Sequence, residues 1–103
     1  MATTDTANQN LIVTAFWEVH SGEEGAVAAL LKDFLPQAQR EAGVKEFQIH
    51  QNVERPREFF FYEVFASEAA FADHQQTGHF KNIIVGQAIP KLAKRERQQF
   101  RFI

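Results

Sequence analysis

The chain of 103 residues is long enough for one hydrophobic core but not for two, and a hydrophobic content of 45% excludes an intrinsically disordered protein. A formal net charge of −2 argues against a nucleic-acid-binding protein, and the absence of cysteine excludes disulfides, a thiolate nucleophile and a cysteine-ligated metal. Eleven phenylalanines indicate a large apolar core, an apolar pocket or both.

Residues 1–10 are polar, with neither a basic start nor an apolar run, so they do not have the form of a signal peptide. We expect a flexible tail over residues 1–10 and one domain over residues 11–103. No apolar run approaches the roughly 20 residues that a membrane helix needs. With no cysteine in the chain, these features favour a cytoplasmic protein.

Leu11 to His20 are mostly β-branched or aromatic and predict the first strand. Ser21 to Glu24 has the form of a capping box, in which the serine oxygen and the last glutamate satisfy free amides. Helical periodicity follows, with an apolar stripe made of Val27, Leu30, Leu31, Phe34 and Ala38. Pro36 predicts a kink or a break in this helix, and Gly43 predicts its end.

Val44 to Val53 predicts a second strand with Phe47, Ile49 and Val53 on one face. The polar turn over residues 54–57 is short, so the second and third strands form an antiparallel hairpin. Five of the seven residues from Phe59 to Phe65 are aromatic, which predicts a third strand buried on both faces.

Ser67 is positioned to cap a short helix that carries Ala70, Phe71 and His74 on one side. Thr77 is positioned to cap a second segment, which Pro90 ends. Its apolar stripe consists of Phe80, Ile83, Ile84 and Ala88.

Lys91 to Gln99 is basic and polar, and we interpret it as a solvated segment that could alternatively hold an anionic substrate. The alternating residues 100–103 predict the last strand.

The predicted order β-α-β-β-α-β is that of a ferredoxin-like α+β domain with a four-stranded antiparallel sheet. Both helices then cover one face of the sheet and leave the other bare, with aromatic side chains of the third strand exposed. An apolar patch of this kind marks an interface, so we expect a homodimer that pairs two sheets face to face.

The sequences Tyr62 to Ser67, Ala70-Phe71 and His74 to Phe80 resemble the signature of the antibiotic biosynthesis monooxygenase (ABM) superfamily. That signature reads Tyr-Glu-x-Trp-x-Ser, a helix, and His-x-x-Thr-Pro-His-Phe. The chain departs from it at Phe65, where most members have tryptophan, and at Gly78, where most have proline. The resemblance implies a dimeric α+β barrel.

The resemblance also implies a small cytoplasmic enzyme that oxidises quinols, anthrones or other polyphenols with dioxygen and uses no metal or flavin cofactor. A related branch isomerises or degrades the phosphorylated autoinducer-2 signal, and another cleaves haem. The haem-degrading branch uses an asparagine, a tryptophan and a histidine at positions that are Ala15, Phe65 and Ile84 here, which argues against haem cleavage.

Cofactor-free oxygenation requires a base near neutral pKa, a donor for the developing oxyanion and walls that exclude water. His74 and His79 are the candidates for acid–base catalysis and for stabilising the oxyanion. A break at Thr77-Gly78 could bring both to one pocket. Glu63 is the candidate to orient them, or to accept the substrate proton. Each of the three could instead be structural, with Glu63 tied to an arginine or to backbone amides.

Five aromatic residues are expected in the hydrophobic core and are also the candidates to line a substrate-binding cavity: Trp17, Phe47, Phe61, Phe65 and Phe80. We expect His20 and His50 to be exposed near strand ends. Two histidines without an acid at ligand spacing do not predict a metal site.

The leading hypothesis is a cofactor-independent monooxygenase acting on a small aromatic, quinol-like substrate. Alternatives are an isomerase or degrading enzyme for a small phosphorylated carbonyl signal, and a dimeric small-molecule-binding protein. An RNA-binding domain of the same topology is disfavoured, because the third strand lacks the Lys/Arg-Gly-Phe-Gly-Phe pattern and carries Glu63 instead.

Overall fold

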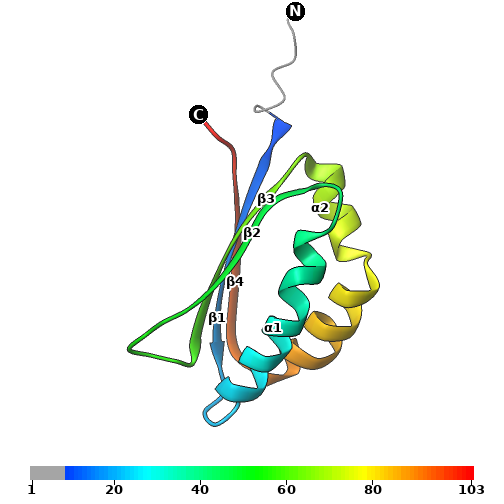
Figure 1. Cartoon of the computed structure of the whole chain (residues 1–103). Coiled ribbons are helices and arrows are strands. Elements are labelled where there is room, and N and C mark those ends of the chain that lie inside the picture. The colour runs from blue at the N-terminus through cyan, green and yellow to red at the C-terminus, as the bar shows by residue number, and fades with distance from the viewer. Residues whose placement is uncertain (1–8) are drawn as a thin grey trace, which may run out of the picture.

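The structure is a computed structural model that describes residues 9–103, so the predicted tail lies almost entirely outside the described residues. The elements follow the predicted order (Figure 1). They are β1 (Leu11–Val19), α1 (Glu24–Gln39), β2 (Val44–Gln51), β3 (Glu58–Phe65), α2 (Glu68–Gln75), the π-helix η2 (Phe80–Ala88), the 3₁₀ helix η3 (Ile89–Lys91) and β4 (Leu92–Phe100).

The four strands form one antiparallel sheet in the order β2-β3-β1-β4. Seen along the sheet in Figure 1, α1, α2 and η2 all lie on the same side, and the other face carries no helix. The ferredoxin-like α+β fold predicted from the sequence is therefore confirmed. Among the helices of residues 9–103, none is long and apolar enough to cross a membrane.

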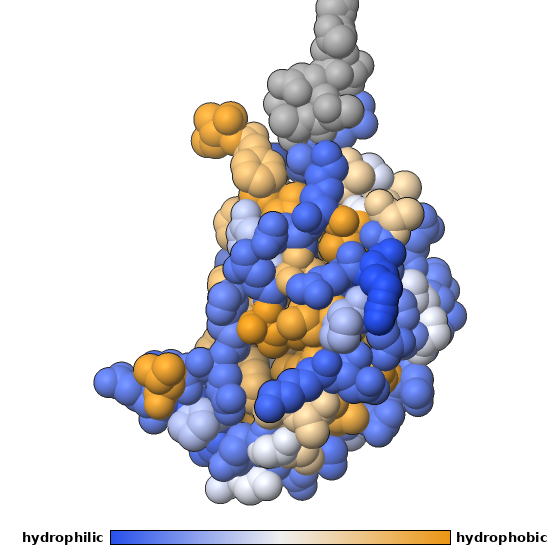
Figure 2. Space-filling view, in the orientation of Figure 1, coloured by the Kyte–Doolittle hydropathy of each residue, from blue (hydrophilic) through white to orange (hydrophobic). Residues whose placement is uncertain are grey.

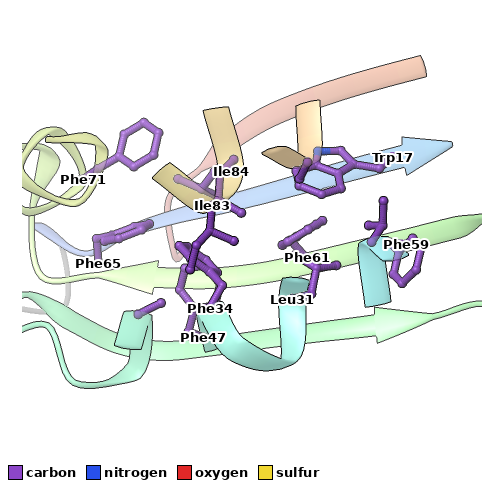
Figure 3. Packing of buried hydrophobic residues seen from close by; sticks show 14 of the residues in the cluster. Trp17, Leu31, Phe34, Phe47, Phe59, Phe61, Phe65, Phe71, Ile83 and Ile84 are labelled. Atoms are coloured by element: carbon purple, nitrogen blue, oxygen red, sulfur yellow. The ribbon is translucent and has the colours of Figure 1, made fainter. Parts of the chain in front are cut away.

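The hydrophobic core fills the space between the sheet and the helical layer. Strand alternation turns Phe59, Phe61 and Phe65 of β3 towards the helices, where each is at most 3% exposed (Figure 3). Phe60 points to the bare face and is 45% exposed. The prediction that this strand is buried on both faces is therefore wrong for the single chain, because helices cover only one face.

The start of α1 differs from the predicted capping box. The N-cap is Glu23, which makes no side-chain capping bond, and Ser21 is exposed outside the helix. The Glu24 carboxylate instead accepts a hydrogen bond from the Gly22 amide at 2.9 Å. The positive φ of Gly22, 89°, allows the chain to turn sharply between β1 and α1.

Pro36 does not break α1, which continues to Gln39. Pro36 lies on the exposed side of the helix, where water can satisfy the carbonyl that loses its amide partner. Gly43 is not the helix stop that we predicted, because the C-cap is Arg40. A Cβ atom at Gly43 would lie 2.4 Å from the Cβ of Ala70, so glycine here permits close approach to α2.

The last strand also differs from the prediction. Residues 101–103 are not in a strand, and the polar run that we interpreted as a solvated segment forms β4 along one edge of β1. Backbone pairing holds β4 although its side chains are mostly exposed. Val53 is likewise not on the Phe47 face of β2: the strand ends at Gln51, and Val53 is 96% exposed in the following loop.

The two predicted caps of the second helical region are present. The Ser67 hydroxyl accepts a hydrogen bond from the Ala70 amide at 3.1 Å, and the Thr77 hydroxyl accepts one from the Phe80 amide at 3.2 Å. The segment after Thr77 is wound as a π-helix over nine residues. Such helices are rare and often mark functional sites.

Candidate functional site

A cavity of about 40 Å³ lies between the sheet and the helical layer. Its walls are mostly aromatic, and its polar groups come from β3, α2 and β4. The lining residues are Ala15, Trp17, Phe34, Phe47, Phe61, Glu63, Phe71, His74, Phe80, Ile84, Arg95 and Arg97.

On the helical side of the site, one carboxylate contacts both candidate histidines. Glu41 follows the end of α1, and its carboxylate accepts hydrogen bonds from His74 Nδ1 at 2.9 Å and from His79 Nε2 at 2.6 Å. The break between α2 and η2 thus brings the two histidines to one acid. Glu41, rather than Glu63, is placed to orient them.

His74 is 2% exposed and is surrounded by aromatic rings. Burial lowers the pKa of His74, and the hydrogen bond with Glu41 opposes this only in part, so the imidazole is neutral at pH 7. Because its Nδ1–H is donated to Glu41, the proton-free nitrogen is Nε2, which has no hydrogen-bond partner among residues 9–103. A neutral histidine held in this way can accept a proton.

Glu63 lines the cavity from β3 and is 7% exposed. Burial raises its pKa to about 8, with Arg97 opposing the shift and Glu41 adding to it. The carboxyl group is therefore protonated at neutral pH and can donate a hydrogen bond.

Two arginines of β4 complete the site. The antiparallel register sets Arg97 beside Ala15 and Arg95 beside Trp17, so both arginine side chains emerge on the helical side of the sheet. The Arg97 guanidinium lies over the ring of Phe71, 5.2 Å from its centroid. Ala15 is paired with Phe61 on β3 and with Arg97 on β4, and its small side chain leaves space between these two.

The predicted site residues are distributed unevenly around the cavity. Trp17, Phe47, Phe61 and Phe80 line it together with His74 and Glu63. Phe65 is fully buried behind His74 and does not line the cavity. His79 also lies outside the lining; it bonds to Glu41, and its ring packs against Phe34, a lining residue.

Sequence reasoning missed Glu41 as a site residue, along with the placement of both β4 arginines. No local pattern could single out Glu41, which is 33 and 38 residues from the two histidines. The spacing of Arg95 and Arg97 could have been used, because residues two apart in a strand lie on the same face of the sheet. Among residues 9–103, no cluster of three or more histidine and acidic side chains is arranged to hold a metal ion.

The fold and the site define a small ferredoxin-like α+β domain with an aromatic cavity between sheet and helices. A family model described as antibiotic biosynthesis monooxygenase matches residues 10–85, which is more than half of the chain. The chain therefore belongs to the antibiotic biosynthesis monooxygenase family.

Solved structures share this fold at low sequence identity. A protein of Bacteroides thetaiotaomicron described as a candidate antibiotic biosynthesis monooxygenase is 24% identical, with a TM-score of 0.86 over 94% of this chain and 92% of that one. One of Nitrosomonas europaea with the same description is 20% identical, with a TM-score of 0.85 over 90% and 98%. A conserved protein of Methanosarcina mazei is 21% identical, with a TM-score of 0.86 over 95% and 97%. No curated protein matches the sequence.

Proposed function

We propose that the protein is a cofactor-independent monooxygenase that oxidises a small aromatic, quinol-like substrate with dioxygen. The observation that carries the proposal is His74, a buried neutral histidine whose Nδ1–H is held by Glu41 while its ring lines an aromatic cavity. This arrangement supplies a base without a metal or an organic cofactor.

The first step is removal of the phenolic proton by Nε2 of His74. Glu41 stabilises the imidazolium that forms and keeps the ring in the required tautomer, so Glu41 is a positioning residue. His79 bonds to the same carboxylate and holds it against His74. Glu63, protonated at neutral pH, donates a hydrogen bond to the developing oxyanion.

The electron-rich anion then transfers an electron to dioxygen, and the resulting radicals combine at a ring carbon to give a peroxide. The peroxide takes the proton back from the His74 imidazolium, and loss of water then leaves the oxidised ring and the neutral base. For hydroquinone the balance is one quinol plus one dioxygen giving one hydroxyquinone plus one water. The aromatic walls exclude bulk water from the anion during these steps.

The same proposal includes a homodimer that covers the bare face of the sheet. Strand register places Phe16, Phe60, Tyr62 and Phe100 on that face, and Phe60 and Phe100 are 45% and 47% exposed. An apolar patch of this kind supports a second copy of the chain as its partner. Light scattering after gel filtration should give twice the mass of 11.8 kDa, and a monomer at micromolar concentration would contradict it.

Oxygen uptake by metal-free protein tests the activity, with hydroquinones, anthrones and catechols as substrates. We expect His74→Asn to lower kcat by about 10²–10⁴-fold, because it removes the base. His20→Asn is the matched control, because His20 is an exposed histidine outside the cavity. Uptake that never exceeds the uncatalysed rate would refute the proposal, as would full activity of a folded His74→Asn variant.

The pH dependence gives a second readout. Activity should fall as pH rises through about 8, because Glu63 then ionises and no longer donates a hydrogen bond. Glu63→Gln keeps a hydrogen-bond donor at every pH, so its activity should not fall as pH rises through about 8. Activity should also fall at low pH, where His74 is protonated and can no longer act as the base. Glu41→Gln should move this fall to lower pH, because the imidazolium loses its stabilising carboxylate.

A further inference from the structure

Arg95 and Arg97 differ from the other arginines of the chain. The side chains of Arg40, Arg55, Arg57 and Arg101 each contact a carboxylate or a backbone carbonyl. Arg95 and Arg97 have no ion pair and no side-chain hydrogen bond among residues 9–103, although both line the cavity. Two cationic groups without anionic partners at a cavity mouth indicate a place for an anion.

The two guanidinium groups repel each other. They are two residues apart on the same face of β4, so their backbones are roughly 7 Å apart. Burial, and then the charge of Arg97, lowers the pKa of Arg95. A guanidinium nevertheless stays charged in proteins. Glu63 does not neutralise them, because its own pKa is raised to about 8 by burial.

We propose that Arg95 and Arg97 form a subsite for an anionic substituent of the substrate, a carboxylate or a phosphate on a small hydroxylated aromatic ring. Guanidinium groups match the oxygens of both anions with paired hydrogen bonds. With the anion at β4, the ring lies over Ala15 and against the rings of Trp17 and Phe61, which contact each other, and its hydroxyl faces Glu63 and His74. This inference rests on the proposed function for the identity of the ring and names the charge that the substrate carries.

The size of the cavity is consistent with arginines that move when the ligand binds. The cavity of about 40 Å³ is large enough for water but too small for an aromatic ring, since a cavity of roughly 150 Å³ accommodates benzene. Both arginine side chains are exposed, so they can swing out without opening the core. Most of the remaining walls are buried aromatic rings that cannot move as easily.

Binding without oxygen isolates the subsite from turnover. The probes are hydroquinone, 2,5-dihydroxybenzoate and 4-hydroxyphenyl phosphate, titrated anaerobically and followed by calorimetry and by the fluorescence of Trp17, the one tryptophan of the chain. We expect at least one anionic probe to bind about tenfold or more tightly than hydroquinone, with a preference that weakens as salt increases. The anionic probe with the larger gain in affinity over hydroquinone identifies the preferred anion as carboxylate or phosphate.

Variants assign the effect to the arginines. The double variant Arg95→Gln/Arg97→Gln should bind all three probes with equal affinity, and Arg97→Gln alone should lose most of the preference. Arg55→Gln is the matched control, because it removes the same charge from an exposed ion pair outside the cavity. Neutral and anionic probes that bind the wild type equally would overturn the inference. So would an anionic preference that survives in the double variant, or no binding of either anion at millimolar concentration.

These results separate the two proposals. Arginine-dependent anion binding in a protein that consumes no oxygen with any probe keeps the subsite and refutes the monooxygenase. Oxygen uptake without any preference for the anionic probes keeps the monooxygenase and refutes the subsite.

Discussion

β3 and β4 both pair antiparallel with β1, one on each side, yet they are held in place by different forces. The inward side chains of β3 are buried against the helices, whereas every residue of β4 from Ala93 to Phe100 is exposed. Hydrophobic packing fixes β3, and the backbone ladder alone fixes most of β4.

This difference bears on function. A strand position that the core needs cannot easily accept a charge, so β3 contributes one carboxyl group whose pKa is raised. The inward positions of β4 are exposed rather than part of the core, and they hold two arginines at the edge of the cavity. Figure 2 shows one side of the molecule, on which hydrophobic residues lie in the middle and hydrophilic residues of the sheet and the helices surround them.

The largest expected effect is on stability, from Phe65→Ala in β3. Phe65 is 0% exposed, and its truncation should lower the free energy of unfolding by about 3–5 kcal/mol. Gln99→Ala in β4 should change it by less than about 0.5 kcal/mol, because Gln99 is exposed. Urea unfolding at one fixed protein concentration measures both, and comparable losses would mean that β4 is packed rather than only paired.

Carboxylates on the two strands should differ in how they couple stability to pH. The folded pKa of Glu63, about 8, lies above its unfolded value of 4.5, so the unfolded chain loses this proton first as pH rises. The wild type should therefore lose stability between pH 4.5 and 8, on the order of 2–4 kcal/mol, and Glu63→Gln should not.

Glu96→Gln in β4 is the matched control for Glu63→Gln. The Glu96 side chain is 60% exposed, so the stability difference between this variant and the wild type should stay constant across the same pH range. A Glu63→Gln variant with the same pH slope as the wild type would show that Glu63 is ionised in the folded protein.

The contrast between the two strands also explains what could be predicted from the sequence. Clustered aromatic residues predicted β3, and the spacing of Ser67, Thr77 and the histidines predicted the helices after it. β4 was misplaced because its composition resembles an exposed segment, and its ladder with β1 depends on residues about 80 positions away. Glu41 reaches the histidines through a similar long-range contact.

The end of β3 is tied to its surroundings by a close backbone approach at Gly43. The Gly43 carbonyl accepts a hydrogen bond from the Ala66 amide at 2.8 Å, and a Cβ at Gly43 would clash with Ala70. Gly43→Ala should therefore destabilise the protein by about 1–3 kcal/mol.

Gly25→Ala is the control for the glycine change. Gly25 is in the first turn of α1 and nothing lies within 4 Å of its missing Cβ, so alanine should stabilise the protein by about 0.4–1 kcal/mol. Thermal unfolding would show shifts of opposite sign. Equal shifts would mean that α2 can move away from Gly43 at little cost.

The smallest effect concerns the two serines that the sequence marked as helix caps. Ser67 follows β3, and its hydroxyl accepts the Ala70 amide, so Ser67→Ala should cost about 1 kcal/mol. Ser21 follows β1 and makes no capping bond, since the N-cap of α1 is Glu23, so Ser21→Ala should leave stability unchanged. Urea unfolding of the two variants side by side measures the difference. Because both serines follow a strand and precede a helix, an equal loss would mean that Ser21 caps α1 in solution and that the predicted capping box forms there.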